Sequence, residues 1–349
     1  MRFRIAPASL AILAFGITSL WAQQPAAPPA PPPERPPAQT QPIRRNVTLV
    51  NVLLTVLDQR NKMVSNLNQQ DFKVFDDNTL QEIRFFGRQS DLPLRVGLLL
   101  DTSNSIRQRL QFEQQAAIDF LYNVIRRDKD QAFIMTVDDI PEVVQGLTGD
   151  LNRLRDVILR QRAGGGTALY DGIYDAAELL SREVPASTNS GLDARGILVV
   201  ISDGNDNLSR HSRGHALEMA QRAGIVIYTI SSSTDWILTD RDTNSFNSAN
   251  RKYMKGDGDR VLEQFAEESG GRAFFPYRVD DLAQSFANIE DELRSQYSLA
   301  YVPSGRFADG KYHRIRIEVS TKGLKVQARK GYYADVTESL GPSLDAPGR

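Results

Sequence analysis

The stretch LRVGLLLDTSNSIRQ, residues 94–108, constrains the fold of this chain more than any other. A continuous apolar run ends on Asp101, and Ser103 and Ser105 follow at alternate positions. Such a run is typical of a parallel strand buried on both faces, and open α/β sheets place their ligand sites at the carboxyl ends of these strands. The pattern D-x-S-x-S also puts three oxygens beside one turn, and oxygen is the ligand that Mg²⁺ prefers. The sequence therefore predicts a cation site at the end of this strand.

Two further segments complete the predicted site. GGGTALYDGIYDAAELL, residues 164–180, is a glycine loop that leads through Thr167 into an amphipathic helix. RGILVVISDGNDN, residues 195–207, is a second buried strand that ends on Asp203. Because glycine has no side chain to clash, the loop can bring Thr167 close to the first strand. We expect the three segments to meet at one edge of the sheet.

Asp101, Ser103, Ser105, Thr167 and Asp203 together resemble the metal-ion-dependent adhesion site (MIDAS) of von Willebrand factor type A (VWA) domains. The resemblance implies that the three hydroxyls bind Mg²⁺ or Mn²⁺ directly. It implies that the two aspartates supply charge, either directly or through water. It also implies a protein partner, whose acidic side chain would complete the coordination of the cation.

The flanking segments extend this resemblance. Residues 46–90 and 295–334 are similar to the flanks of a secreted bacterial group usually labelled VWFA-related and most often seen in acidobacteria. The similarity covers residues 46–335, which is nearly all of the chain that would remain after removal of a signal peptide. These residues indicate the family but identify no individual member.

Residues 92–294 alternate apolar strands with helical patterns, which predicts a doubly wound, mostly parallel, Rossmann-like α/β domain. The predicted strands are 94–101, 131–138, 196–202, 225–230 and 272–275, and the predicted helices are 106–127, 150–161, 169–183, 212–223, 259–269 and 279–294. Residues 43–91 and 295–335 are rich in β-forming residues, with three strands expected after residue 295. We expect these two flanks to pair into a small appended antiparallel β module, because one hairpin alone is marginally stable.

The N-terminal residues resemble an export signal. Residues 1–22 place two arginines before a short apolar stretch and Ala22, which predicts a cleaved signal peptide; an uncut membrane anchor is the alternative. Residues 23–42 are rich in proline and alanine and predict an extended spacer, and residues 336–349 read as a tail. The chain has no cysteine, which excludes disulfides and a lipoprotein anchor. We expect a secreted, periplasmic or cell-envelope protein without a membrane span after cleavage.

The charge balance argues against nucleic acid as a partner, since 42 basic residues face 43 acidic ones. The main functional prediction is a non-enzymatic, metal-dependent binding or adhesion module. Two alternatives stay open. A metal-assisted hydrolase would need Asp101 or Asp203 as its base, because none of the three site segments contains His or Glu. A scaffold that binds through the β module would leave the metal site vestigial, with Asp101 capping the next helix and Ser103 and Ser105 satisfying turn amides. The sequence leaves the oligomeric state open.

Other polar residues carry weaker signals. His211 and His215 are four residues apart on a predicted helix, but the HSRGH run offers no acidic third ligand, so an exposed helix face is favoured. Asp171 and Asp206 lie near the predicted site, either as groups that hold its ligands in place or, at least as well, as solvated aspartates at helix starts. Neither pair is assigned to the ligand set.

Three loops match functional motifs only in part. DRDTNS, residues 240–245, resembles the start of a calcium loop but lacks the required glycine and glutamate. KGDGD, residues 255–259, contains a match to an adhesion-ligand tripeptide, but a match of three residues is expected by chance. The AGGGT loop lacks the lysine of a phosphate-binding loop, which argues against nucleotide binding.

Overall fold

The computed structural model describes residues 49–88, 92–184, 194–233, 255–276, 279–304 and 309–334. The predicted signal peptide, the spacer, the C-terminal tail and the calcium-like loop at 240–245 lie outside the described residues. Among the helices that are described, none combines the length and the apolar character that a membrane crossing requires.

A six-stranded sheet forms the centre of the α/β domain, with the strand order β10-β9-β8-β5-β6-β7 in the described residues. Its strands are β5 (Leu94–Asp101), β6 (Gln131–Val137), β7 (Glu142–Thr148), β8 (Arg195–Ser202), β9 (Val226–Ser231) and β10 (Ala273–Phe274). All neighbouring pairs are parallel except β6 and β7, which are antiparallel. The predicted mostly parallel sheet is confirmed.

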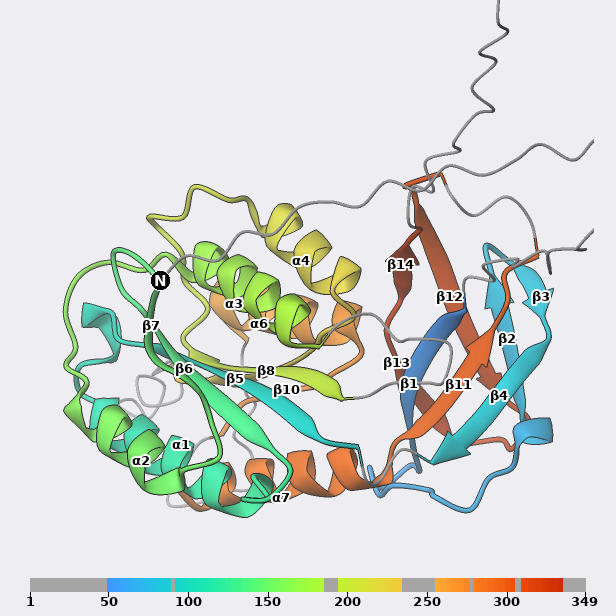
Figure 1. Cartoon of the computed structure of the whole chain (residues 1–349), viewed down its shortest axis with the longest axis horizontal. Helices are drawn as coiled ribbons and strands as arrows, with labels where there is room; N and C mark the ends of the chain where they lie inside the picture. The colour runs from blue at the N-terminus through green and yellow to red at the C-terminus, as the bar shows by residue number, and fades with distance from the viewer. Residues whose placement is uncertain are drawn as a thin grey trace, which may run out of the picture. The chain divides into compact units, whose positions relative to one another are not determined.

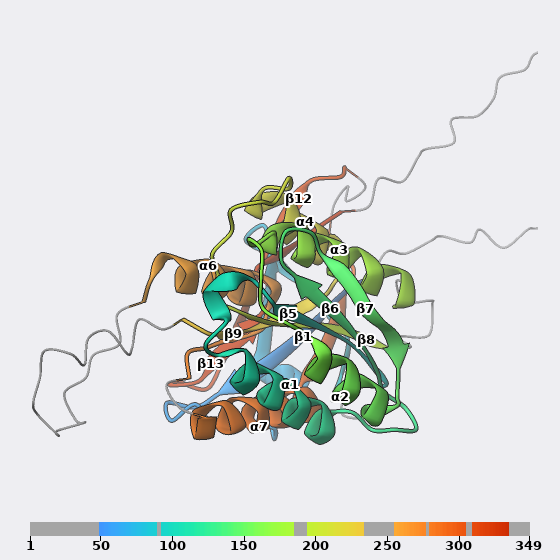
Figure 2. The same cartoon turned by 90° about the vertical axis from the view of Figure 1, so that its left-hand side faces the viewer.

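Helices cover both faces of this sheet (Figures 1 and 2). The helices are α1 (Leu110–Val124), α2 (Leu151–Arg160), α3 (Leu169–Glu183), α4 (Arg213–Arg222), α6 (Asp257–Ser269) and α7 (Val279–Ser295), with a 3₁₀ helix, η2, at Asn104–Ile106. Buried side chains of α1, α2 and α7 form one core with the sheet, and those of α3, α4 and α6 form a second core on the opposite face. Burial on both faces explains why β5 and β8 are almost continuously apolar.

Two details of this domain differ from the sequence prediction. Strand β7 was not predicted, because its residues are half-exposed at the sheet edge and carry too few apolar side chains to indicate a buried strand. Helix α1 begins at Leu110 rather than at residue 106, because Asn104–Ile106 form the separate 3₁₀ helix η2 before it.

The β module contains two four-stranded sheets, ordered β13-β1-β11-β4 and β14-β12-β2-β3. Its strands are β1 (Val50–Leu57), β2 (Phe72–Asp76), β3 (Thr79–Gln81), β4 (Ile83–Arg88), β11 (Tyr297–Tyr301), β12 (Tyr312–Val319), β13 (Lys325–Ala328) and β14 (Gly331–Tyr333), with a 3₁₀ helix, η1, at Gln69–Asp71. β1 pairs with β11 and β13, and β2 pairs with β12, all antiparallel. The predicted module built from both flanks is confirmed, although β14 was not predicted.

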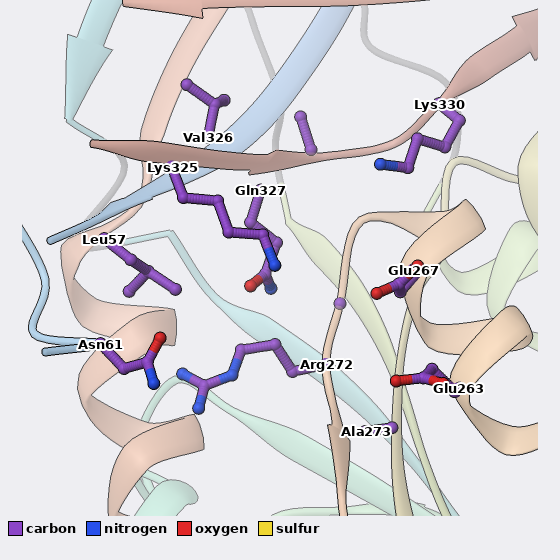
Figure 3. A pocket seen from close by; sticks show the side chains of 12 residues that line it. Leu57, Asn61, Glu263, Glu267, Arg272, Ala273, Lys325, Val326, Gln327 and Lys330 are labelled. Atoms are coloured by element: carbon purple, nitrogen blue, oxygen red, sulfur yellow. The ribbon is translucent and has the colours of Figure 1, made fainter. Parts of the chain in front are cut away.

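The module packs against the α/β domain through α7, whose last residue, Ser295, is separated from β11 by one residue. The fully buried carboxylate of Glu292 on α7 accepts hydrogen bonds from Thr55 Oγ1 of β1 (3.2 Å), Tyr228 OH of β9 (3.1 Å) and Gln327 Nε2 of β13 (2.8 Å). A cavity of about 190 Å³ lies beside this contact, and Figure 3 shows Arg272 and side chains of β13 and α6 around it. The carboxylate of Glu292 on α7 therefore joins one strand of the α/β domain, β9, to two strands of the β module, β1 and β13.

Candidate metal site

The predicted site residues lie at the carboxyl ends of β5 and β8, which are parallel neighbours in the middle of the sheet. Asp101 is the last residue of β5, and Asp203 directly follows Ser202, the last residue of β8. In the sheet, β5 is flanked by β6 on one side and by β8 on the other. The order of the strands therefore reverses between β5 and β8. Ligand crevices of open α/β sheets form at such a reversal.

Asp101 is almost fully buried, with 1% of its surface exposed. Its Oδ1 accepts a hydrogen bond from the Ser103 N–H (2.9 Å), and its Oδ2 accepts one from Ser202 Oγ (2.7 Å). Burial raises the pKa of Asp101, the serine hydrogen bonds oppose this rise, and the charge of Asp203 adds to it. One hydrogen bond to each oxygen orients the Asp101 carboxylate and leaves a lone pair on each oxygen, so Asp101 can supply its charge directly or through water.

The hydroxyls of Ser103 and Ser105 are hydrogen-bonded to each other at an Oγ–Oγ distance of 2.9 Å. Ser103 precedes η2 but makes no side-chain capping bond, so the alternative in which this hydroxyl satisfies a turn amide does not hold. Two neighbouring ligands of an octahedral Mg²⁺ with metal–oxygen distances of about 2.1 Å lie about 3.0 Å apart. The hydrogen-bonded serine pair therefore has a spacing close to that of two adjacent ligands of Mg²⁺.

The glycine loop is hydrogen-bonded to the loops that follow β5 and β8. The Gly164 N–H donates to the carbonyl of Thr102 (2.8 Å). The Thr167 N–H donates to Asn207 Oδ1 (2.8 Å), and its carbonyl accepts from the Asn207 N–H (3.0 Å). Gly165 has a φ of +72°, a conformation that favours glycine. These contacts fix Thr167 between the two strand ends, with its hydroxyl in no hydrogen bond to the described part of the chain.

A crevice of about 160 Å³ opens beside Asp203 and Ser105. The opposite wall of this crevice is formed by the KGDGD segment, residues 255–259, for which the sequence motifs indicated no function. A Cβ on Gly258 would lie 2.1 Å from the carbonyl oxygen of Asp203, and one on Gly204 would lie 2.2 Å from that of Gly258. Only two glycines permit this contact between backbones that are far apart in sequence. The start of α6 therefore belongs to the rim of the site.

Glu113 of α1 is a further acidic residue of the site, which sequence reasoning missed. It is 2% exposed, and neither carboxylate oxygen has a hydrogen bond of ordinary geometry within the described residues. Burial raises its pKa well above the ordinary value, and the charge of Asp101 adds to the effect. The three site segments themselves contain no glutamate; Glu113 comes from α1, a helix whose packing the motif does not reveal.

Asp171 is also buried, at 3% exposed, so its interpretation as a solvated aspartate was wrong. Its Oδ1 accepts hydrogen bonds from the His211 N–H (2.8 Å) and contacts His211 Nδ1 (2.8 Å), and the Arg210 N–H also donates to it (3.1 Å). Burial by itself would raise the pKa of Asp171, but the bonds from His211 and Arg210 lower it. Asp171 fastens the segment after β8 to α3.

The interpretations of Asp206 and of the histidine pair also change. Asp206 accepts hydrogen bonds from the Tyr170 N–H (3.0 Å) and from the Ser209 hydroxyl, so it is not simply solvated. His211 precedes the first residue of α4, whereas His215 is exposed on that helix. The two histidines therefore do not share a helix face as the sequence suggested.

The sequence of this region matches a known family. Residues 96–205 match the family model of the von Willebrand factor type A domain. These residues are a VWA domain. The match includes β5, the glycine loop and the end of β8, and so spans all five predicted ligand positions. A comparison with curated proteins gives no match.

Several solved structures are similar to this chain. A von Willebrand factor type A protein from Catenulispora acidiphila is 11% identical, with a TM-score of 0.46 over 84% of this chain and 75% of that one. BatB from Bacteroides thetaiotaomicron is 15% identical, with a TM-score of 0.42 over 58% and 100%. Proximal thread matrix protein 1 from the mussel byssus, with a zinc-occupied MIDAS motif, is 16% identical, with a TM-score of 0.44 over 63% and 50%. With TM-scores below 0.5, these likenesses say nothing of what this chain binds.

Proposed function

We propose that this chain is a non-enzymatic, metal-dependent protein-binding module. Mg²⁺ or Mn²⁺ would be bound directly by the hydroxyls of Ser103, Ser105 and Thr167, while Asp101 and Asp203 supply charge. The observation that carries this proposal is the serine pair, whose 2.9 Å spacing fits two neighbouring ligands of one cation.

The charges around the hydroxyls fit a divalent cation. Asp101 and Glu113 are buried, and Asp203 is close enough for its charge to raise the pKa of both. Buried carboxylates are costly unless a cation or a hydrogen-bond donor compensates them. Arg109 donates to the carbonyls of Ser232 and Ser233, and its charge partly offsets the rise in the pKa of Glu113; a divalent cation would supply further compensating charge.

The hydroxyl ligands point to an acidic partner. Hydroxyls are neutral ligands, so a cation held by them keeps much of its charge and attracts a carboxylate. The crevice beside Asp203 and Ser105 provides room for such a side chain. Hydrolysis has less support, because a general base must reach the substrate and Glu113, the added acidic residue, is buried. We further propose an exported protein of the bacterial VWFA-related group, acting in adhesion outside the cell, in the periplasm or at the envelope.

Thermal unfolding tests the metal site. We expect Mg²⁺ or Mn²⁺ at about 100 times its dissociation constant to stabilise the folded chain by about 2.7 kcal/mol, or roughly 5 °C in Tm. EDTA should reverse the shift, and Asp101→Ala should abolish it. The measurement is calorimetry or fluorescence of the full chain with EDTA, Mg²⁺, Mn²⁺ or Ca²⁺.

Asp156→Ala is the matched control, because Asp156 is an exposed carboxylate on α2 whose ion pair with Arg155 is at the surface. This variant should keep the full metal response. Identical melting curves of the wild-type chain in EDTA and in every cation would refute the proposal. Binding of an acidic protein that survives both EDTA and Asp101→Ala would favour a scaffold that acts through the β module.

A further inference from the structure

A second cluster of metal-ligand residues lies in the β module, at the turn between β2 and β3. Asp76, Asp77 and His313 each offer one ligand atom, and these three atoms lie within 4.8 Å of one another. His313 Nδ1 is 2.8 Å from Asp77 Oδ2 and 3.9 Å from Asp76 Oδ1. Asp76 ends β2 and His313 belongs to β12, so strand pairing brings the three residues together.

Asp76 is the residue that indicates a missing cation. Its side chain is 1% exposed, and its Oδ2 accepts hydrogen bonds from Tyr301 OH and Tyr332 OH, both at 2.9 Å. Its Oδ1 is buried, has no hydrogen bond within the described residues and faces His313 Nδ1. A buried carboxylate oxygen is normally hydrogen-bonded or bound to a cation. The two tyrosines thus hold this carboxylate with one oxygen directed into the cluster.

The other two ligand groups are also held in place. Asp77 is half-exposed, and its Oδ1 accepts a hydrogen bond from the Arg314 N–H (2.9 Å), which leaves Oδ2 facing His313. His313 Nε2 contacts Asp309 Oδ1 at 3.2 Å. Histidines that bind metals through one ring nitrogen commonly donate the other ring N–H to a carboxylate, which fixes the tautomer. Asp309 has that position here.

We propose that Asp76 Oδ1, Asp77 Oδ2 and His313 Nδ1 bind a zinc ion, with water as the fourth ligand. Imidazole together with carboxylates suits Zn²⁺ better than Mg²⁺, which prefers oxygen ligands alone. The two carboxylates balance the charge of the ion, and the proton on Nδ1 leaves to solvent when the metal binds. The ion would fasten the β2–β3 turn to β12. This site is independent of the proposed MIDAS.

Zinc titration of the full chain carrying Asp101→Ala tests this inference without interference from the first site. We expect isothermal titration calorimetry to show one Zn²⁺ per chain, and native mass spectrometry to show the same stoichiometry. Asp77→Asn should weaken binding at least tenfold, and His313→Gln should remove it. Asp309→Asn should weaken binding about 10- to 100-fold, as expected for a residue that positions a ligand.

His215→Gln is the matched control, because His215 is an exposed histidine on α4. This variant should bind zinc as the Asp101→Ala chain does. Because Asp77 is half-exposed, Asp77→Asn keeps the test valid even where His313→Gln fails to fold. The inference is overturned by an Asp101→Ala chain that binds no zinc, by zinc binding that persists unchanged in Asp77→Asn, or by a stoichiometry that falls with His215→Gln.

Discussion

Replacing Asp130 with alanine should lower the free energy of unfolding by about 3–5 kcal/mol, the cost of breaking a buried ion pair by removing one partner. The Asp130 side chain is fully buried, and its Oδ1 accepts a hydrogen bond from the Leu94 N–H (2.8 Å) at the start of β5. It forms ion pairs with Arg126 (3.0 Å) and Arg294 (3.4 Å). Alanine would leave both guanidinium groups without this partner and the Leu94 N–H without an acceptor. Chemical denaturation at pH 7 measures the change.

Asp156→Ala again provides the comparison. The Asp156–Arg155 pair is at the surface, where an ion pair contributes about 0–1 kcal/mol. We expect the two alanine variants to differ by at least 2 kcal/mol. A loss below 1 kcal/mol for Asp130→Ala would show that the carboxylate is not what holds β5, α1 and α7 together at this end of the sheet.

The same carboxylate should make stability depend on pH in the acidic range. Burial alone would raise the pKa of Asp130, but the hydrogen bonds from Arg126 and Leu94 outweigh it, and the net pKa is lowered. A lowered pKa in the folded state means that the stabilisation is present above the unfolded pKa of about 3.9 and is lost as the pH falls through the folded value. The difference in stability between wild type and Asp130→Asn should therefore shrink below about pH 4. Urea titrations from pH 7 to pH 3 test this, and a difference that grows on acidification would contradict it.

Glu292→Ala should have the second large effect, about 3–5 kcal/mol, because it removes a buried charge from the contact between the α/β domain and the β module. The hydroxyls of Thr55 and Tyr228 would lose their acceptor. Arg272 NH1, 3.6 Å from Glu292 Oε2, would lose its ion pair. We expect the two parts of the chain to unfold in separate transitions, because their shared carboxylate is gone. Differential scanning calorimetry measures this as two peaks.

Asp291→Ala is the control for this change, since Asp291 is the neighbouring residue on α7 and is exposed. A surface substitution of this kind usually changes stability by less than 0.5 kcal/mol. A single transition with an unchanged midpoint in Glu292→Ala would mean that apolar packing, rather than this carboxylate, joins the two parts.

Local sequence pattern was sufficient for the main elements of the VWA domain. The apolar run from 94 to 101 and the amphipathic pattern from 169 to 183 coincide with β5 and α3 to the residue. Both elements are long and strongly patterned, because β5 is buried on both sides and α3 buries one face. Strand β7 lies at a sheet edge and β14 is three residues long, so neither has a pattern that separates it from a loop.

The chain's own residue order was enough to show that hydroxyls and carboxylates follow two buried strands, and parallel strands bring their carboxyl ends to one edge. Burial, however, is decided by neighbours that are distant in sequence. Only the tertiary structure placed Glu113 beside Asp101, the KGDGD backbone against Asp203, and His313 beside Asp76. The physical reason is that periodicity records which face of one element is buried. It does not record which polar groups of separate elements converge once those faces pack together.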